Sequence, residues 1–324
     1  MKRREWLVTM AGSLAALRER MQAAAPSDDV NIKWAVSMFL WTSTQWTASS
    51  HNFTDMLDVI KDTGFEGFRL TGWPKSLESY GMPPARLLKE LSKRDLRIVT
   101  LSFGGPADDP SQHAAIEKKA HAACNLLNDF GATEMVVLSP RRPNKVLMRH
   151  NMGIACEFWN RLGDLCADYG IRAGLHNHSQ GQLVESQDEV ELMLKLTDPK
   201  RFHWSPDTVH LYLGGCDVVD LFERYGHRLM FMDYVDVKYV YADTDYKLAN
   251  GLTAEAGTHS ATFMLCNQDF GDGVLDLPAL HGVLKKNSYK GWICIDHHYT
   301  PVSPQHSFTK CRKYIHERLE PIYS

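Results

Sequence analysis

The stretch Ala173-Gly-Leu-His-Asn-His-Ser-Gln-Gly181 contains the unit from which the rest of the chain is built. A short apolar run over residues 172–176 ends in a polar loop with a glycine, and a segment of helical periodicity follows at 186–196. Residues two apart in a strand point to the same side, so His176 and His178 should face the same way. A strand, a loop and a helix in this order predict one unit of a parallel sheet.

The same unit recurs along the chain. Strands are predicted at 33–40, 67–70, 97–103, 134–139, 172–176, 202–206, 229–238 and 291–296. Helices are predicted at 53–63, 84–94, 113–130, 151–169, 186–196, 217–225, 277–286 and 305–319, with Gly64, Gly131 and Gly170 as C-terminal stops. Eight alternations predict a single-domain (β/α)8 TIM barrel over residues 29–324. A doubly wound sheet is the alternative, but no G-x-G-x-x-G follows the first strand.

Composition restricts the class of partner. The chain has 324 residues, of which 44% are hydrophobic and 23% charged, and its net charge is -3. No basic run follows the first 20 residues, which argues against binding to nucleic acid or anionic lipid. The seven cysteines stand singly without C-x-x-C spacing, which argues against a disulfide framework or a structural zinc site. The expected partner is a small molecule.

The N-terminal 28 residues are treated apart from the barrel. Lys2-Arg3-Arg4-Glu5-Trp6-Leu7, the weakly apolar run 8–17 and Ala23-Ala-Ala-Pro26 resemble a twin-arginine export signal, which would place the protein in the periplasm. The alternative is an amphipathic leading helix of a cytoplasmic protein, which Arg18-Glu19-Arg20 favours. Both readings stay open at about equal weight, and the apolar run is too short to span a bilayer.

In a barrel of this kind the active site lies at the carboxyl ends of the strands. Polar and aromatic residues after the early strands are therefore candidates for substrate binding, and His298 joins them from the last strand: Trp41, Arg69, Trp73, Arg142 and His298. Indole rings stack on the apolar face of a sugar, and arginine binds phosphate or carboxylate. Core packing is an equally open alternative for the tryptophans, and a surface role is favoured for Arg142, because no phosphate nest accompanies it.

The last four strands end in one imidazole and three carboxylates: His176, Asp207, Asp236 and Asp296. Together they predict a site for a divalent metal ion with open positions for substrate oxygens, with Mn²⁺ favoured and Co²⁺, Mg²⁺ or Zn²⁺ as alternatives. The plainer alternative is that Asp207 caps a turn and that Asp236 pairs with Lys238.

Three stretches carry a resemblance to a known family. Ser205-Pro-Asp-Thr-Val-His210 is similar to an Asp-Thr-Gly-His segment, Phe270-Gly-Asp-Gly-Val-Leu-Asp-Leu-Pro278 to a Gly-x-Gly-x-x-Asp-x-Pro segment, and Tyr289-Lys-Gly-Trp-Ile-Cys-Ile-Asp296 to a Gly-Tyr-x-Gly-Trp strand. From about residue 31 onward the chain therefore resembles the sugar phosphate isomerase/epimerase superfamily. These xylose isomerase-like barrels include inosose dehydratases, ketose 3-epimerases and endonuclease IV.

The resemblance implies a metal held by strands five to eight, where the family usually supplies Glu, Asp, His and Glu. This chain supplies His176, Asp207, Asp236 and Asp296 at the matching stretches, as if the imidazole and an acid had exchanged places. Asp296 is shorter than the usual Glu. His297 or His298 could therefore reach the ion in its stead.

Such a site suits removal of a proton next to a carbonyl. His178 is the first candidate for the base and His210 the second, while Lys238 would stabilise the charge that develops on oxygen. The stretch around His178 is most similar to inosose dehydratases and enzymes of 3-keto sugars, so β-elimination from a keto-sugar, keto-glycoside or keto-inositol is favoured. Epimerisation and non-catalytic sugar binding are the alternatives. An endonuclease role is disfavoured by the net charge of -3.

The stretch 239–268 follows the seventh strand without strong periodicity. Long connections of this kind in compact domains are usually functional or interfacial. We expect a lid over the site or a contact in a homo-oligomer.

Overall fold

The structure is a computed structural model. It describes residues 32–42, 52–141, 148–179, 181–241, 243–247, 253–255 and 259–324. The predicted N-terminal signal and the predicted substrate-binding residue Arg142 lie outside these residues.

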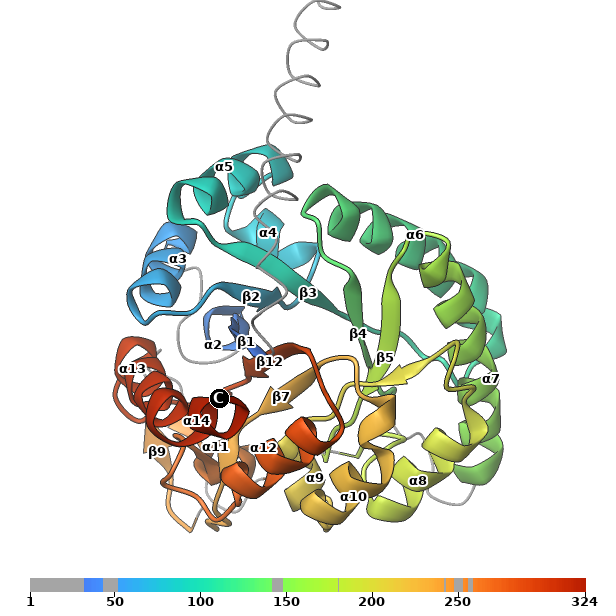
Figure 1. Cartoon of the computed structure of the whole chain (residues 1–324). Coiled ribbons are helices and arrows are strands. Elements are labelled where there is room, and N and C mark those ends of the chain that lie inside the picture. Colours follow the sequence, from blue (N-terminus) through green and yellow to red (C-terminus); the bar gives the residue numbers. More distant parts are fainter. Residues whose placement is uncertain are drawn as a thin grey trace, which may run out of the picture.

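Eight parallel strands form the centre of the molecule (Figure 1). They are β1 (Ile32–Ser37), β2 (Gly67–Leu70), β3 (Arg97–Phe103), β4 (Glu134–Leu138), β5 (Arg172–His176), β6 (His203–Trp204), β7 (Met232–Tyr234) and β12 (Gly291–Ile295). The hydrogen-bonded order is β6-β5-β4-β3-β2-β1-β12-β7. Parallel bridges from Trp204 to Leu229 and from Asp207 to Asp233 join β6 to β7 and close the barrel. The predicted TIM barrel is confirmed.

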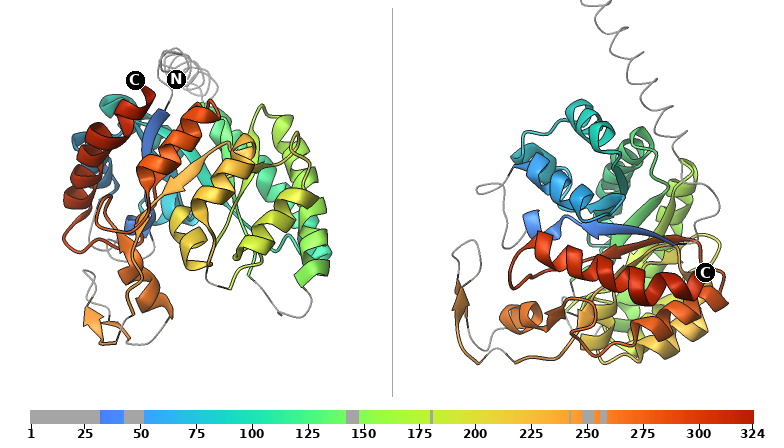
Figure 2. Two further views of the ribbon diagram at one scale, coloured as in Figure 1. Left: turned by 60° about the horizontal axis from the view of Figure 1, so that its bottom comes forward. Right: turned by 60° about the vertical axis from the view of Figure 1, so that its left-hand side comes forward.

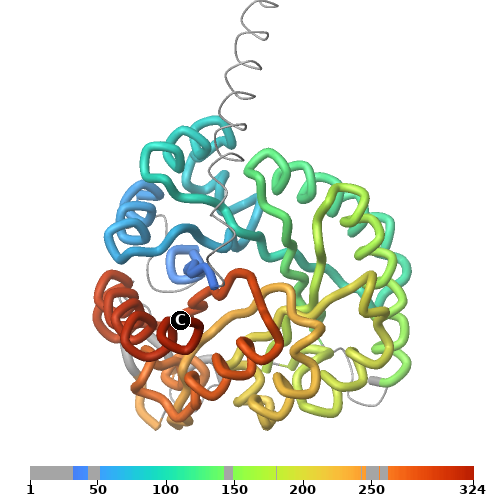
Figure 3. Tube along the Cα trace, viewed as in Figure 1, coloured from blue at the N-terminus to red at the C-terminus, as the bar shows by residue number. Residues whose placement is uncertain are grey.

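Helices surround the strands, and the chain alternates between the two layers as it goes round (Figure 3). The described helices are α2 (Phe39–Thr42), α3 (Phe53–Asp62), α4 (Lys75–Ser79), α5 (Pro84–Arg94), α6 (His113–Asp129), α7 (Met148–Ala167), α8 (Gln187–Leu196), α9 (Thr208–Leu213), α10 (Val218–Tyr225), α11 (His259–Cys266), α12 (Leu277–Lys286), α13 (Pro304–Tyr314) and α14 (Glu320–Tyr323). None of these helices is long and apolar enough to cross a membrane.

Local sequence signals set the ends of these helices. Ser186 and Glu189 form a capping box at the start of α8, and Asp276 caps α12 through its side chain. Gly131 and Gly170, just after α6 and α7, both have a φ of 70°, the left-handed conformation that terminates helices and that glycine adopts without strain. The short turns that follow then direct each chain segment into the next strand.

The seventh strand departs from its prediction. The predicted strand at 229–238 is divided into β7 and β8 (Asp236–Val237), and β8 leaves the barrel to pair antiparallel with β11 (Asn267–Gln268). Between them, β9 (Tyr246–Lys247) and β10 (Thr253–Ala254) form a hairpin that projects from the body of the molecule (Figure 2). The inward-facing residues at this position of the barrel therefore come from β7. Residues 236–238, which the prediction included in the strand, lie outside the barrel.

A cluster of buried apolar residues separate from the main core includes Ala35, Val99, Val136 and Cys294 of four barrel strands. Asp296 follows Cys294 by two residues and so faces the same side of the sheet. The strands thus carry apolar residues lower in the barrel and polar residues at their carboxyl ends. We call this end of the barrel the mouth.

Candidate active site

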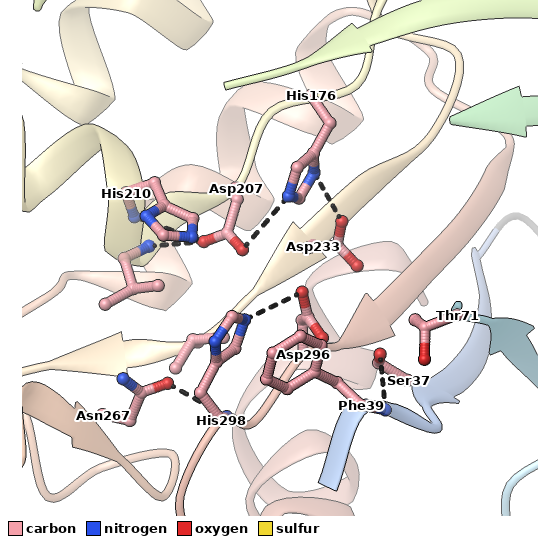
Figure 4. A network of polar contacts seen from close by, with 12 residues as sticks. Ser37, Phe39, Thr71, His176, Asp207, His210, Asp233, Asn267, Asp296 and His298 are labelled. Atoms are coloured by element: carbon pink, nitrogen blue, oxygen red, sulfur yellow. Dashed lines mark hydrogen bonds and ion pairs between the residues drawn. The ribbon is translucent and has the colours of Figure 1, made fainter. Parts of the chain in front are cut away.

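Four side chains from β5, the end of β6, β7 and the end of β12 meet at the mouth (Figure 4). They are His176, Asp207, Asp233 and Asp296, all buried, with one potential ligand atom from each within 4.8 Å of the others. His176 Nδ1 lies 3.0 Å from Asp233 Oδ2, and His176 Nε2 lies 3.9 Å from Asp207 Oδ2. We call these four residues the mouth group.

Asp207 is oriented by the start of α9. Its Oδ1 accepts hydrogen bonds from the backbone N–H groups of Val209 at 2.9 Å and His210 at 3.3 Å, as an N-cap does. Its own N–H donates to Asn177 Oδ1 at 3.2 Å. Oδ2 is left buried without a hydrogen-bond partner among the described residues and is directed toward His176. Asp207 therefore caps the helix through Oδ1, as the plainer alternative predicted, and still directs Oδ2 into the site.

Arg69 of β2 lies beneath the mouth group and joins two of its carboxylates. Its Nη1 donates to Asp233 Oδ2 at 2.5 Å, and its Nη2 donates to Asp296 Oδ2. The guanidinium is 2% exposed. This ion pair leaves Asp296 Oδ1 buried and without a hydrogen-bond partner in the described part of the chain. Arg69 was predicted to bind substrate, but its two Nη atoms are used to hold carboxylates in place.

The charges of the mouth group are strongly coupled. Burial, together with Asp296 and Asp233, raises the pKa of Asp207 well above its usual value. Burial raises the pKa of Asp233 to about 8 although Arg69 opposes the shift. Burial also opposes ionisation of Asp296, but Arg69 and His298 outweigh it and hold the pKa of Asp296 well below its usual value. Three carboxylates therefore share a space that one arginine cannot neutralise.

The residues of the mouth group fit a divalent cation. The donor set consists of one imidazole and three carboxylates, and each carboxylate keeps one oxygen without a hydrogen-bond partner among the described residues. Burial and the charge of Arg69 lower the pKa of His176 to about 3, so its ring is neutral at pH 7, as a metal ligand must be. With Arg69 present, a charge of +2 would balance three ionised carboxylates. Oxygen and imidazole donors suit Mn²⁺, Co²⁺, Zn²⁺ and Mg²⁺.

Three further imidazoles lie beside the mouth group. The rings of His178 and His210 have centroids 4.4 Å apart, and the ring of His298 lies 5.7 Å from that of His210. We call His178, His210 and His298 the imidazole cluster. Phe263 of α11 stacks on His210 at 4.7 Å and meets the edge of His298 at 4.9 Å. The stretch 239–268, predicted as a lid or an interface, thus supplies a helix that covers these rings.

The tautomer of His210 follows from its contacts with Ser179. The backbone N–H of Ser179 donates to His210 Nδ1 at 3.1 Å, and Ser179 Oγ lies 2.9 Å from the same atom. A nitrogen that accepts an N–H is unprotonated, so the neutral ring carries its proton on Nε2. Burial and the neighbouring His178 lower the pKa of His210, which keeps the ring neutral. His210 therefore presents a donor, and Nε2 cannot ligate a metal in this tautomer.

A comparison with protein families matches residues 57–313 to the xylose isomerase-like TIM barrel family. The chain belongs to this family. It is also 26% identical over 305 residues to an inosose dehydratase of Bacillus licheniformis, a match that covers 89% of this chain and 96% of the relative.

Solved structures share the fold of this chain. The IolI protein, solved with a bound zinc atom, superposes with a TM-score of 0.70 at 13% identity and covers 90% of this chain and 99% of its own. A probable 3-DHS dehydratase, AsbF of Bacillus anthracis, superposes with a TM-score of 0.67 at 14% identity, with 88% of this chain and 99% of its own covered.

Within this family fold, Asp236 is placed differently from its prediction. Its two carboxylate oxygens accept hydrogen bonds from the backbone N–H groups of Val237, Gly271, Gly273 and Leu275 at 2.8 to 3.1 Å. The predicted pairing with Lys238 is absent from the contacts of the described residues, because these four donors saturate the carboxylate. Asp236 fixes the loop after β11, and Asp233 takes the place in the mouth group that the sequence assigned to Asp236.

The remaining predicted site residues lie at different distances from the mouth group. The side chain of Lys238 is exposed, beyond the point where β8 leaves the barrel. Trp41 is 2% exposed and packs against Phe308 of α13, so the prediction that it stacks on a sugar is corrected to a role in the core. Trp73 is partly exposed after β2 and is packed against the core. His298 lies at the site, where its Nε2 is 3.4 Å from Asp296 Oδ2.

The sequence did contain a signal for Asp233, the carboxylate that the prediction did not include. Asp233 is the one charged residue in the apolar run Leu229-Met-Phe-Met-Asp-Tyr-Val235, and a carboxylate inside a strand buried on both faces needs a partner. Arg69 in Gly-Phe-Arg-Leu gives the complementary signal on β2. Together they could have been read as a buried ion pair across the barrel.

Proposed function

We propose that this chain is a divalent-metal-dependent dehydratase that removes water from a keto-sugar, a keto-glycoside or a keto-inositol. The observation that carries the proposal is the mouth group, with free carboxylate oxygens directly beside the imidazole cluster. Its inosose dehydratase relatives and the 3-DHS dehydratase neighbour support a dehydratase. The zinc atom in the IolI structure supports metal binding by a barrel of this fold.

His176, Asp207, Asp233 and Asp296 would hold the ion. A divalent cation polarises a carbonyl and makes the neighbouring C–H more acidic. The protein's own part is to position the substrate, to exclude water and to move the proton. Arg69 keeps Asp233 and Asp296 in a fixed orientation, because each is bound by a different arm of one planar guanidinium.

We assign the proton transfer to His178. Burial and the neighbouring His176 and His298 lower its pKa well below 6.5, so the ring is neutral and able to accept a proton at pH 7. Its Nδ1 has no hydrogen-bond partner among the described residues, and its side chain is only partly buried. Part of the His178 side chain is therefore accessible, whereas His176 is fully buried.

His178 alone can carry out both proton transfers of the elimination. His178 takes the proton from the carbon next to the carbonyl, the bond to the β-hydroxyl breaks, and the protonated His178 returns its proton to the departing oxygen. The products are water and an unsaturated ketone. His210 donates through Nε2–H to a substrate oxygen and does not exchange its own proton, because Ser179 fixes its tautomer. His210 thereby changes from the second candidate base to a positioning donor.

The test uses purified full-length protein and a panel of inososes, 3-keto glycosides and ketoses in D₂O, followed by NMR. We expect loss of one water from a keto substrate. We also expect deuterium in the recovered substrate at the carbon next to the carbonyl, where the proton has been removed and a deuteron returned before elimination. His178→Ala should retain the metal but lose the uptake, while His121→Ala, a change at an exposed histidine of α6, should behave as wild type. Unchanged deuterium uptake in His178→Ala would reject the base.

The same experiment separates the alternatives. A product of unchanged mass and inverted configuration would identify an epimerase, and binding without any proton exchange would identify a sugar-binding protein. Purification without chelator should give at least one divalent ion per chain by elemental analysis. If no ion is found and added Mn²⁺ or Co²⁺ changes neither thermal stability nor turnover, metal dependence is rejected.

A further inference from the structure

A second group of metal-ligating side chains lies outside the barrel, behind the mouth. It consists of Asp269 after β11, His297 after β12 and Cys311 of α13, and all three are buried. One donor atom of each lies within 4.8 Å of the others. Neighbouring residues of an extended chain point to opposite sides. Since Asp296 faces into the barrel, His297 faces out toward α13, where its ring stacks on Phe308 at 5.9 Å.

The distances are those of ligands around a common centre. His297 Nε2 lies 3.4 Å from Asp269 Oδ1 and 3.5 Å from Cys311 Sγ. The distance to Asp269 is longer than the 2.7–3.2 Å of an N–H···O hydrogen bond, and one ring nitrogen cannot direct a single proton or lone pair at both neighbours. Tetrahedral zinc with ordinary bond lengths has N···O edges of about 3.3 Å and N···S edges of about 3.5 Å.

The donor types point the same way. A thiolate, an imidazole and a carboxylate are the ligands that Zn²⁺ takes in proteins, and a thiolate with a carboxylate would balance its charge. The four residues of the mouth group contain no sulfur, so the two groups differ in chemistry as well as in position. The backbone N–H of Phe270 donates to Cys311 Sγ at 3.4 Å and would also stabilise a metal-bound thiolate at this position.

We propose that Asp269, His297 and Cys311 form a second metal site, specific for Zn²⁺ or a similar thiolate-binding ion, that is structural and distinct from the mouth group. Such an ion ties the loop after β11 and helix α13 to the end of β12. His297 stands between Asp296 of the mouth group and His298 of the imidazole cluster. Tethering its side chain therefore fixes the backbone that carries both neighbours. The fourth position would be taken by a water molecule.

The test is titration of chelator-treated full-length protein with Co²⁺, read by absorption. A cobalt–thiolate bond gives an intense charge-transfer band in the near ultraviolet, which oxygen and imidazole ligands do not give. We expect this band in the wild type, its loss in Cys311→Ser, and its retention in Cys216→Ser, a matched change at another buried cysteine. Asp207→Ala should also retain the band while losing an ion from the mouth group, which separates this proposal from the proposed function.

A band that persists in Cys311→Ser, or its absence from the wild type, would overturn the proposal. If Cys311→Ser does not fold, the proposal can still be tested on the wild-type protein alone, by X-ray absorption. X-ray absorption of the zinc-loaded protein should detect a sulfur neighbour at about 2.3 Å. Spectra that require only nitrogen and oxygen neighbours would equally overturn it.

Discussion

Asp233 and Asp236 are three residues apart, yet the regions they belong to treat a buried carboxylate in opposite ways. Asp233 lies inside the barrel, close to Asp207 and Asp296, and forms an ion pair with Arg69. Asp236 lies on β8 outside the barrel and accepts four backbone N–H groups. A carboxylate whose oxygens all accept backbone N–H groups stabilises a loop. Carboxylates that lie together with too few hydrogen-bond donors keep oxygens that can bind a ligand.

The largest expected effect is on turnover, through Asp233. Asp233→Asn removes one charge from the mouth group, so the protein should lose its bound ion. Lewis-acid stabilisation is worth several kcal/mol, so kcat/KM should fall roughly 10³-fold. Elemental analysis and steady-state kinetics measure both. With metal removed from both proteins, the thermal midpoint of the variant should equal or exceed that of the wild type, because like charges no longer repel. A folded variant with full activity and metal content would show that Asp233 is not a ligand.

The matched change, Asp236→Asn, should act on stability. The amide keeps one acceptor oxygen but turns an NH₂ toward backbone donors, and hydrogen bonds to charged groups contribute about 1.5–3 kcal/mol each. We expect the free energy of unfolding to fall by about 3 kcal/mol in urea titration, with near-normal turnover of the folded fraction. Loss of the bound ion without loss of stability would reverse the roles of the two aspartates.

A third change asks whether the mouth group needs the shape of the Arg69 side chain or only its charge. Arg69→Lys keeps one positive charge but cannot bind Asp233 and Asp296 with two arms of a plane. Groups that orient metal ligands typically change metal affinity or activity 10–100-fold, and we expect a decrease of about that size. Isothermal titration with Mn²⁺ and kinetics would measure it, and wild-type values would show that charge alone suffices.

The smallest expected effect concerns a carboxylate at the other end of the barrel. Burial raises the pKa of Glu134, at the start of β4, to about 7, although Arg172 opposes the shift. Between pH 4.5 and 7 the folded protein therefore binds more protons than the unfolded chain. The stability that this carboxyl contributes falls as pH rises through that window, by at most about 1.4 kcal/mol per pH unit.

Glu134→Gln should flatten this dependence, because the amide does not titrate. Urea titrations of wild type and variant at several pH values would compare the two slopes. An identical slope in both proteins would assign the pH dependence to other groups, of which the mouth group is the first candidate.

The fold could be read from the sequence because it depends on repeated local signals. The strand at 172–176 and the helix at 84–94 were placed to the residue, since an apolar run and a proline at the start of a helix determine them locally. The seventh strand was not, because nothing in the run 229–238 marks where the chain leaves the barrel. That exit depends on pairing with β11, some 30 residues later.

The site residues differ in the same way: some are marked by local sequence signals, and others depend on long-range packing. His176, Asp207 and Asp296 stand at predicted strand ends, so their convergence followed from the barrel. The identity of the third carboxylate, Asp233, did not, since it required knowing where β7 ends. The trio of Asp269, His297 and Cys311 has no sequence signature at all. Single cysteines without C-x-x-C spacing argued against structural zinc, but ligands from three separate elements need no fixed spacing.

The antiparallel pairing of β8 with β11 brings Val237 and Asn267 face to face. Everything between them, including the hairpin β9–β10 and the helix that covers the imidazole cluster, is consequently an insertion with adjoining ends. Lengthening or replacing such an insertion costs little loop-closure entropy, since the cost grows only with the logarithm of its length. This one segment can therefore change in length or sequence while the barrel and the position of Asp233 stay unchanged.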